Sequence, residues 1–379
     1  MAQEEGLSLT VLAKTFVREL SHVSREGQDP ITLEDLASHQ SGLPLVAGNF
    51  WQEGDNRYSH DLSGQRWLGY DEAMLTDWLT STDFRRPESP SYLYSNLGAG
   101  VLSVCLAKHD GKSIAEVIEA RICEPLGLQD TGFQVEQTVH GYTATLEQTD
   151  HWVSADAVFA GAYGLRSTAR DMAVFAREVM AMENGKLGRV VVESAKVRGK
   201  INDLENTCQG WKRNVFDVLY TTGSTGGFKS AMFLHLPSRT GVVVLVNTAV
   251  GGNSSHRGKY IDSLAGGLLN VALGVAPPAI PIPRIREREA FELKPLAGTY
   301  VTQSPGPGPK DITVSFEDGH LTMEGSEGDP TILWPTDGER FFLKEHALEM
   351  EFHHDAEGSA VKGMTMTVEG HKVKMVRRE

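Results

Sequence analysis

The sequence predicts an α/β (α+β) protein in which helices flank an antiparallel sheet, followed by a small antiparallel β-barrel. Three observations lead to this prediction. Capped helices with apolar stripes recur through the first half of the chain. Two apolar strands joined by a short turn follow at residues 231–247, which is a hairpin signal. After a proline-rich stretch at 276–283, short strands alternate with glycine- and acid-rich turns.

Length and charge limit the classes of function. A chain of 379 residues is long for one hydrophobic core, which predicts two domains. The net charge of −14 argues against binding nucleic acid or an anionic membrane through bulk charge. Neither a secretory signal nor an apolar run long enough for a bilayer is visible, so a soluble cytoplasmic protein is expected.

The cysteines predict no metal site. Cys105, Cys123 and Cys208 lie in apolar or helical surroundings, and their spacing fits no metal-binding pattern. Buried free thiols are therefore expected. We expect neither a metal nor a cofactor.

Helix signals follow one another through the first part of the chain. Thr32 and Asp35 have the spacing of a capping box, as do Ser113 and Glu116. A loose turn is expected at 161–164, and a surface loop at 49–65. The expected helices span residues 31–39, 71–79, 97–108, 113–122, 167–182 and 261–273.

The strands of the first unit are expected after residue 210. Residues 211–220 alternate like a strand, and 221–228 form a glycine-rich turn. Strands at 231–236 and 241–247 complete the hairpin. The run 242–246 is apolar throughout, so we expect this strand to be covered on both faces.

These patterns divide the chain into three parts: a first domain at 1–275, a proline-rich linker at 276–290, and a small, lipocalin-like β-barrel at 291–379. The expected barrel strands are 298–301, 312–314, 321–323, 341–343, 348–352 and 363–367.

Tyr94 and Asn96 are the first candidate site residues. They lie in the stretch 92–98, just before the expected buried helix, and can present a phenol and an amide to one cavity. A phenol near cations has its pKa lowered from about 10 and can then act as a base. The alternative is that these residues only form a turn.

Four stretches together resemble the serine β-lactamase and penicillin-binding-protein-like hydrolases, especially the class C-like branch with its esterases and D-aminopeptidases. They occur in the family's order across most of residues 7–275. The resemblance implies a β-lactamase/transpeptidase-like fold and acyl transfer on a small ester, amide, peptide or β-lactam substrate. The stretches are 31–44, 94–96 with 124–128, 164–171, and 222–228.

The resemblance also implies residue roles. In the family a helical serine attacks a carbonyl, and a lysine three residues later takes its proton. Tyr94 matches the family tyrosine that shares the proton transfer, and Asn96 matches its amide neighbour. Thr222 and Gly223 match the Thr-Gly of the third motif, and the Ser224 N–H is the candidate oxyanion donor.

This chain departs from the family pattern in two places. Thr221 stands where the third motif has a cation, which removes a charge that would lower the pKa of Tyr94. Residues 3–20 resemble the segment after the catalytic helix, so the nucleophile and its lysine are expected upstream of Met1. A rival alignment places Lys14 on that lysine but puts Val11 at the serine. Ser359-Ala360-Val361-Lys362 is a literal Ser-x-x-Lys in an expected strand, so we interpret it as a chance match.

Whether the chain is an active enzyme stays open at this point. One interpretation is a serine hydrolase whose Ser-x-x-Lys segment is missing here. The alternative is an inactive or repurposed relative that binds a small acyl or peptide ligand between Tyr94 and Ser224, and a third is a partner module centred on the barrel. If the segment expected upstream includes a strand and part of the central helix, the remaining sheet has an exposed edge and an uncovered apolar face, and aggregation or a homo-oligomer is expected.

Overall fold

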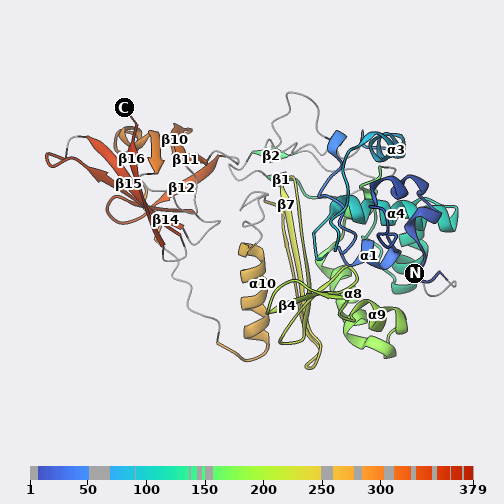
Figure 1. Ribbon diagram of the computed structural model, residues 1–379. Coiled ribbons are helices and arrows are strands. Elements are labelled where there is room, and N and C mark those ends of the chain that lie inside the picture. The colour runs from blue at the N-terminus through green and yellow to red at the C-terminus, as the bar shows by residue number, and fades with distance from the viewer. Residues whose placement is uncertain are drawn as a thin grey trace.

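The protein has a helical layer, an antiparallel sheet and a β-barrel set apart from them (Figure 1). This arrangement comes from a computed structural model. It describes residues 7–50, 69–89, 91–135, 138–142, 147–149, 157–248, 259–276, 284–302, 311–325, 330–343, 348–358, 360–368 and 371–378. Residues 51–65 of the expected loop at 49–65 and residues 277–283 of the linker at 276–290 lie outside these residues.

The six expected helices are confirmed. Thr32 and Ser113 form the predicted capping boxes, and Thr168 caps the helix expected at 167–182. With those that were not expected, the helices of the first part of the described chain are α1 (Leu33–Ala37), α3 (Glu72–Ser81), α4 (Asn96–Asp110), α5 (Ile114–Ile118), α6 (Glu124–Leu126), α7 (Ala160–Tyr163), α8 (Ala169–Ala181), α9 (Arg189–Ser194) and α10 (Lys259–Ala272). A π-helical turn, Glu119–Cys123, joins α5 to α6.

The segment expected as a loose turn at 161–164 is instead helical, which corrects that prediction: Ala160–Tyr163 form α7. It packs directly on α4 because glycines stand at the contact. A Cβ added to Gly161 would meet the Ser103 Oγ at 1.7 Å, and one added to Gly100 would meet the Val158 carbonyl oxygen at 2.7 Å. The glycines therefore permit a helix contact that local propensity does not predict.

The sheet has six strands in chain order, each antiparallel to its neighbours. They are β3 (Gly199–Lys200), β4 (Glu205–Thr207), β5 (Lys212–Asn214), β6 (Val218–Thr225), β7 (Phe228–His235) and β8 (Thr240–Val246). The hairpin expected at 231–247 is confirmed as β7 and β8.

Two expectations around this sheet are wrong. The single strand expected at 211–220 is broken, because the Asn214 side chain accepts the N–H groups of Phe216 and Val218 and Asp217 adopts a φ of 58°. The residues expected as a turn at 221–228 belong mostly to β6, which pairs with β7 through Thr225. Pairing along the whole strand outweighs the turn tendency of its small residues.

Alternation of side chains gives the sheet two covered faces. The sheet lies between α10 and α8 (Figure 1). Tyr220 and Phe233 face α10 on one side, and Leu219 and Met232 face α8 on the other. Both helices contact β8, so the expectation that 242–246 is covered on both faces is confirmed.

The tail forms a closed antiparallel barrel of eight strands, as its strand pattern predicted. Its core includes Tyr300, whose hydroxyl donates to the Leu296 carbonyl at 2.6 Å. The sequence missed β12 and β16. The strands are β9 (Gly298–Thr302), β10 (Asp311–Glu317), β11 (His320–Gly325), β12 (Thr331–Pro335), β13 (Arg340–Leu343), β14 (Leu348–His354), β15 (Val361–Val368) and β16 (His371–Arg377).

Shorter elements complete the described chain. In the helical part they are the 3₁₀ turns Ala13–Thr15, Arg18–Val23, Gly48–Phe50 and Met182–Asn184, with the hairpin β1 (Gly141–Tyr142) and β2 (Gln148–Thr149). Before the barrel they are α11 (Ala290–Leu293) and the 3₁₀ turn Lys294–Leu296. In the part of the chain that the structure describes, no helix has both the length and the apolar character needed to cross a bilayer.

Replacing Thr32 by alanine tests the first capping box. The Thr32 hydroxyl accepts the Asp35 N–H at 3.1 Å, and an Asp35 carboxylate oxygen accepts the Thr32 N–H at 2.8 Å. Thr32→Ala is expected to lower the free energy of unfolding by about 1 kcal/mol, measured by denaturant titration. Thr80→Ala, at an exposed position of α3, is the control and should change it by less than about 0.5 kcal/mol. Equal effects would contradict the role of the cap.

Candidate functional site

Tyr94 and Asn96 lie on either side of the residue that caps α4. Ser95 is fully buried, and its hydroxyl accepts the Gly98 N–H at 2.8 Å while donating to the Pro44 carbonyl at 2.6 Å. These two bonds satisfy a free N–H of the first helical turn and fix where the chain enters α4. The cap thus leaves Tyr94 half exposed and Asn96 almost buried.

His39 holds the backbone on both sides of Tyr94. Its carbonyl accepts the Leu93 N–H at 2.8 Å, and its Nδ1 accepts the Ser95 N–H at 3.2 Å. Its ring centroid lies 4.6 Å from that of Tyr94. A φ of 56° directs His39 into this position. His39 therefore fixes the backbone that carries Tyr94.

Burial governs the electrostatics of the tyrosine. It raises the pKa of Tyr94 from its usual value, whereas a neighbouring cation would lower it. Burial also raises the pKa of Tyr163 well above its usual value, with a smaller contribution from Tyr94. Burial, together with the charge of Lys212, lowers the pKa of His39 to about 4. Near neutral pH these rings are therefore uncharged.

A polar network beside this cluster was missed by the sequence analysis. The Tyr220 hydroxyl donates to the Glu205 carboxylate, and the Lys212 Nζ lies 5.8 Å from the centre of the Tyr220 ring. Asp262 on α10 interacts electrostatically with Lys212 and Glu205, and burial raises its pKa. Its Oδ1 is buried and is the atom without a hydrogen-bond partner among the described side chains. Lys212 thus places a cation near the site, although Thr221 does not.

The residues Thr221, Thr222, Gly223 and Ser224 are consecutive on β6 and exposed. The pairing of β5 with β6 ends at Lys212 opposite Tyr220, so Thr221 begins a part of β6 that β5 does not cover. Because side chains alternate, Thr221 points to the α8 face, whereas Thr222 and Ser224 share the α10 face with Tyr220.

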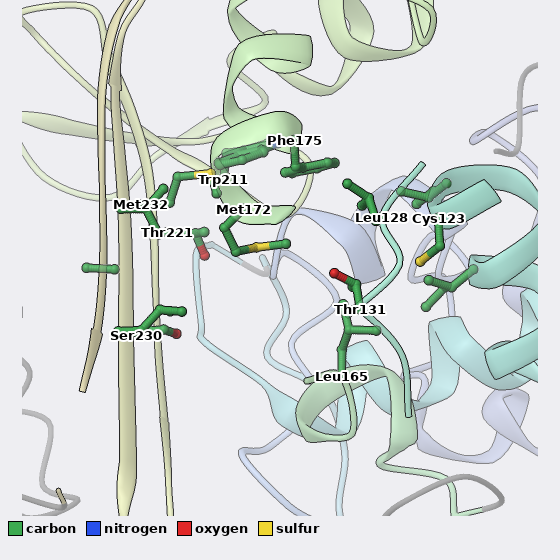
Figure 2. A pocket seen from close by; sticks show the side chains of 15 residues that line it. Cys123, Leu128, Thr131, Leu165, Met172, Phe175, Trp211, Thr221, Ser230 and Met232 are labelled. Atoms are coloured by element: carbon green, nitrogen blue, oxygen red, sulfur yellow. The ribbon is translucent and has the colours of Figure 1, made fainter. Parts of the chain in front are cut away.

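Thr221 also lines a cavity of about 230 Å³ between the sheet and the helices (Figure 2). Figure 2 shows Thr221, Ser230 and Met232 on the strand side, facing Thr131 and Leu165 across the opening. The lining is almost entirely apolar. The lining residues are Ile118, Ile122, Cys123, Leu128, Thr131, Leu165, Met172, Phe175, Trp211, Thr221, Ser230, Ala231, Met232, Val243 and Leu245.

The structure brings the predicted site residues together in two groups. Tyr94 and Asn96 lie at the start of α4, and 221–224 lie on β6. His39 packs on Tyr94 and interacts electrostatically with Lys212, which pairs with Tyr220, the residue before Thr221. Tyr94 is not among the residues that line the cavity. Lys212 was missed because its proximity to His39 depends on strand pairing, which no local pattern in the sequence reports.

The serines next to Tyr94 are not exposed, and the described residues form no metal cluster. Ser41 and Ser95 are fully buried. Ser359 lies outside the described residues, and Lys362 is exposed on β15. Cys105, Cys123 and Cys208 are buried free thiols, and the described acidic, histidine and cysteine residues form no cluster that could hold a metal.

The pKa of His39 predicts a specific pH dependence. The folded state lowers the pKa of His39 from 6.5 to about 4, so it favours the neutral imidazole. The contribution of His39 to the free energy of unfolding is therefore complete above pH 6.5 and is lost as the pH falls towards 4. His39→Gln should weaken the fall in unfolding free energy across this range, measured by denaturant titration at several pH values. His22→Gln, at an exposed position, is the control. An unchanged slope in His39→Gln would refute this assignment.

Comparison with known proteins places this geometry in a family. The sequence profile described as Beta-lactamase matches residues 2–266. Penicillin-binding protein 4* of Bacillus subtilis is 22% identical over 350 residues, which cover 85% of this chain and 73% of that protein. A beta-lactamase-like protein of Arthroderma benhamiae is 23% identical over 205 residues, covering 50% of this chain and 33% of that protein.

Solved structures show the same fold. An octameric penicillin-binding protein homologue from Pyrococcus abyssi superimposes with a TM-score of 0.56 at 18% identity, covering 100% of this chain and 83% of that one. A class C beta-lactamase from Rhodobacter sphaeroides gives a TM-score of 0.55 at 24% identity, covering 72% and 81%. With the profile match spanning most of the 379 residues, the chain belongs to the serine β-lactamase and penicillin-binding-protein-like family.

Proposed function

We propose that the site between Tyr94 and Ser224 serves acyl transfer on a small ester, amide or β-lactam. Tyr94 would carry the proton, Asn96 would orient the substrate amide, and the β6 edge at Thr222 and Gly223 would bind the carbonyl group through the Ser224 N–H. The observation that carries the proposal is the pair of hydrogen bonds by which His39 fixes the backbone on both sides of Tyr94. The part of β6 that begins at Thr221 is not covered by β5, which leaves it accessible to a substrate.

The cavity supports the choice of substrate class. Its apolar lining suits an acyl group, and the Thr221 hydroxyl offers one of its few polar contacts. A Ser-x-x-Lys on one helix face does not occur in the described residues. The proposal therefore assigns the proton transfer and the carbonyl binding to the residues named above.

A second candidate function is binding without turnover. Two observations favour it: burial raises the pKa of Tyr94, and Thr221 stands where the family motif has a cation. A neutral phenol donates a hydrogen bond but is a poor base near neutral pH. In this version the same residues retain a small acyl or peptide ligand, with no covalent step.

Self-association is also part of the proposal. The penicillin-binding protein homologue from Pyrococcus abyssi, which covers this chain completely, is octameric. Its assembly supports a homo-oligomer for this chain as well.

Covalent probes test for a nucleophile that the structure does not reveal. A fluorophosphonate and benzylpenicillin are both expected to leave the mass of this chain unchanged, because Ser41 and Ser95 are buried and neither has a lysine one helical turn away. Intact-protein mass spectrometry is the measurement, with an active serine hydrolase as the positive control. Rapid labelling of one serine would contradict this expectation and would identify a nucleophile in this chain.

Ligand binding tests the site itself. Tyr94→Phe and Thr221→Val are each expected to weaken reversible benzylpenicillin binding roughly fivefold, the effect of about one lost hydrogen bond. Calorimetric titration measures the change. Thr240→Val, on β8 at the hairpin end of the sheet, is the matched control and should bind like the wild type. If Tyr94→Phe and Thr221→Val both bind unchanged, the ligand site lies elsewhere.

A further inference from the structure

The hairpin formed by β4 and β5 is attached to the segment that carries His39. Thr207 on β4 is buried, and its hydroxyl donates to the Ser38 carbonyl at 2.8 Å. In the turn that follows, the Gly210 N–H donates to the Ala37 carbonyl at 2.8 Å. The two bonds join the hairpin to the residues immediately before His39.

Contacts from β3 hold the same segment on both sides of His39. Arg198, which precedes β3, forms an ion pair with Glu34 at 3.3 Å. A Cβ added to Gly199 would meet the Gln40 Nε2 at 2.7 Å, so the strand and the Gln40 side chain are in direct contact. The three short strands β3, β4 and β5 therefore fix residues 34–40 as a unit.

The His39 ring connects this segment to Tyr94 through one nitrogen. Nδ1 accepts the Ser95 N–H at 3.2 Å, so the proton of the neutral ring lies on Nε2. A doubly protonated imidazole is a donor at both nitrogens and would lose the bond to Ser95. The position of Tyr94 therefore depends on a neutral His39.

Lys212 carries the charge that acts on His39. It is the second residue after Gly210 and begins β5, opposite Tyr220. The attachment of the hairpin to Ala37 brings this part of β5 close to His39, and the two side chains interact electrostatically. A cation beside an imidazole disfavours a second proton on the ring. The hairpin thus brings to His39 a group that opposes its protonation.

Among the described residues, the other titratable groups packed on the His39 ring are two tyrosines. The ring centroids of Tyr92 and Tyr94 lie 6.0 and 4.6 Å away, and burial raises the pKa of both. Glu205 on β4 acts on Tyr92, and Tyr163 on α7 interacts with Tyr94. Lys212 is therefore the charged side chain whose removal should change the protonation of His39.

We propose that Lys212 is a positioning residue of the candidate site, which keeps His39 neutral so that its bond to the Ser95 N–H fixes Tyr94. The inference rests on the proposed function of Tyr94 and adds the β4–β5 hairpin to that site. Lys212 acts through His39 and needs no contact with the substrate. A cation on β5 then serves a site whose own strand, β6, has Thr221 where the family motif has a cation.

Proton NMR titration of His39 tests the effect of the charge in the full chain, with His39→Gln identifying the signal. Lys212→Met should raise the pKa of His39 from about 4 but leave it below 6.5, because burial, the larger cause, remains. Lys212→Gln is the alternative neutral variant if Lys212→Met does not fold. Lys212→Arg keeps the cation and should titrate like the wild type. Lys200→Met removes an exposed lysine of β3 that pairs with Asp203, and is the matched control.

Hydrogen exchange of the Ser95 amide tests the link to Tyr94. In the wild type the protection of this amide should fall as the pH approaches 4, and in Lys212→Met the fall should begin at a higher pH. Benzylpenicillin binding should follow the same profiles. Between pH 4 and 6.5 it should be weaker in Lys212→Met than in the wild type, and well above pH 6.5 the two should bind alike.

The outcomes separate this inference from the proposed function. A His39 pKa that does not rise in Lys212→Met, or Ser95 protection that keeps the wild-type pH profile, would overturn the role of Lys212. Binding that is weakened equally at every pH would also overturn it, because that pattern indicates direct contact with the ligand. A wild type that binds no benzylpenicillin would instead contradict the proposed function, while the His39 and Ser95 measurements still decide the role of Lys212.

Discussion

The alternation of side chains along β6 and β7 is the constraint on which the first domain depends. Every second residue faces α10 and the others face α8, so both faces of the sheet must be covered. The outer face is closed by Tyr220 and Phe233 under α10. On the other face, α8 covers the sheet only in part, and the apolar cavity lined by Thr221 lies next to the part that α8 leaves uncovered. The candidate site lies where this covering stops.

Desolvation, rather than charge pairing, sets the chemistry near Tyr94. Removing a phenol or an imidazole from water disfavours its charged form, which raises the pKa of a tyrosine and lowers that of a histidine. Both shifts occur here, in Tyr94 and in His39. The cluster can therefore donate and accept hydrogen bonds without carrying charge, and the cation of Lys212 acts on it from the neighbouring strand.

Features encoded by nearby residues could be predicted from the sequence. The capping boxes at Thr32 and Ser113 depend on residues three apart, and the hairpin at 231–247 depends on one turn. Family motifs identified the fold and the stretch around Tyr94. What failed depends on distant contacts or on competition between local tendencies. The break at Asn214, the extension of β6 through Thr225 and the contact of Gly161 with Ser103 are of this kind.

Asp262 and His39 give two regions of the protein opposite responses to acid. The Asp262 Oδ1 is buried and has no hydrogen-bond partner among the described side chains. Burial raises the pKa of Asp262, so α10 is held most firmly when this carboxyl is protonated, and its attachment weakens as the pH rises through the folded-state pKa. The His39 contact responds in the reverse direction. A falling pH therefore loosens the loop that carries Tyr94, and a rising pH loosens the helix over the far face of the sheet. Local opening in this fold would move from one layer to the other as the medium changes.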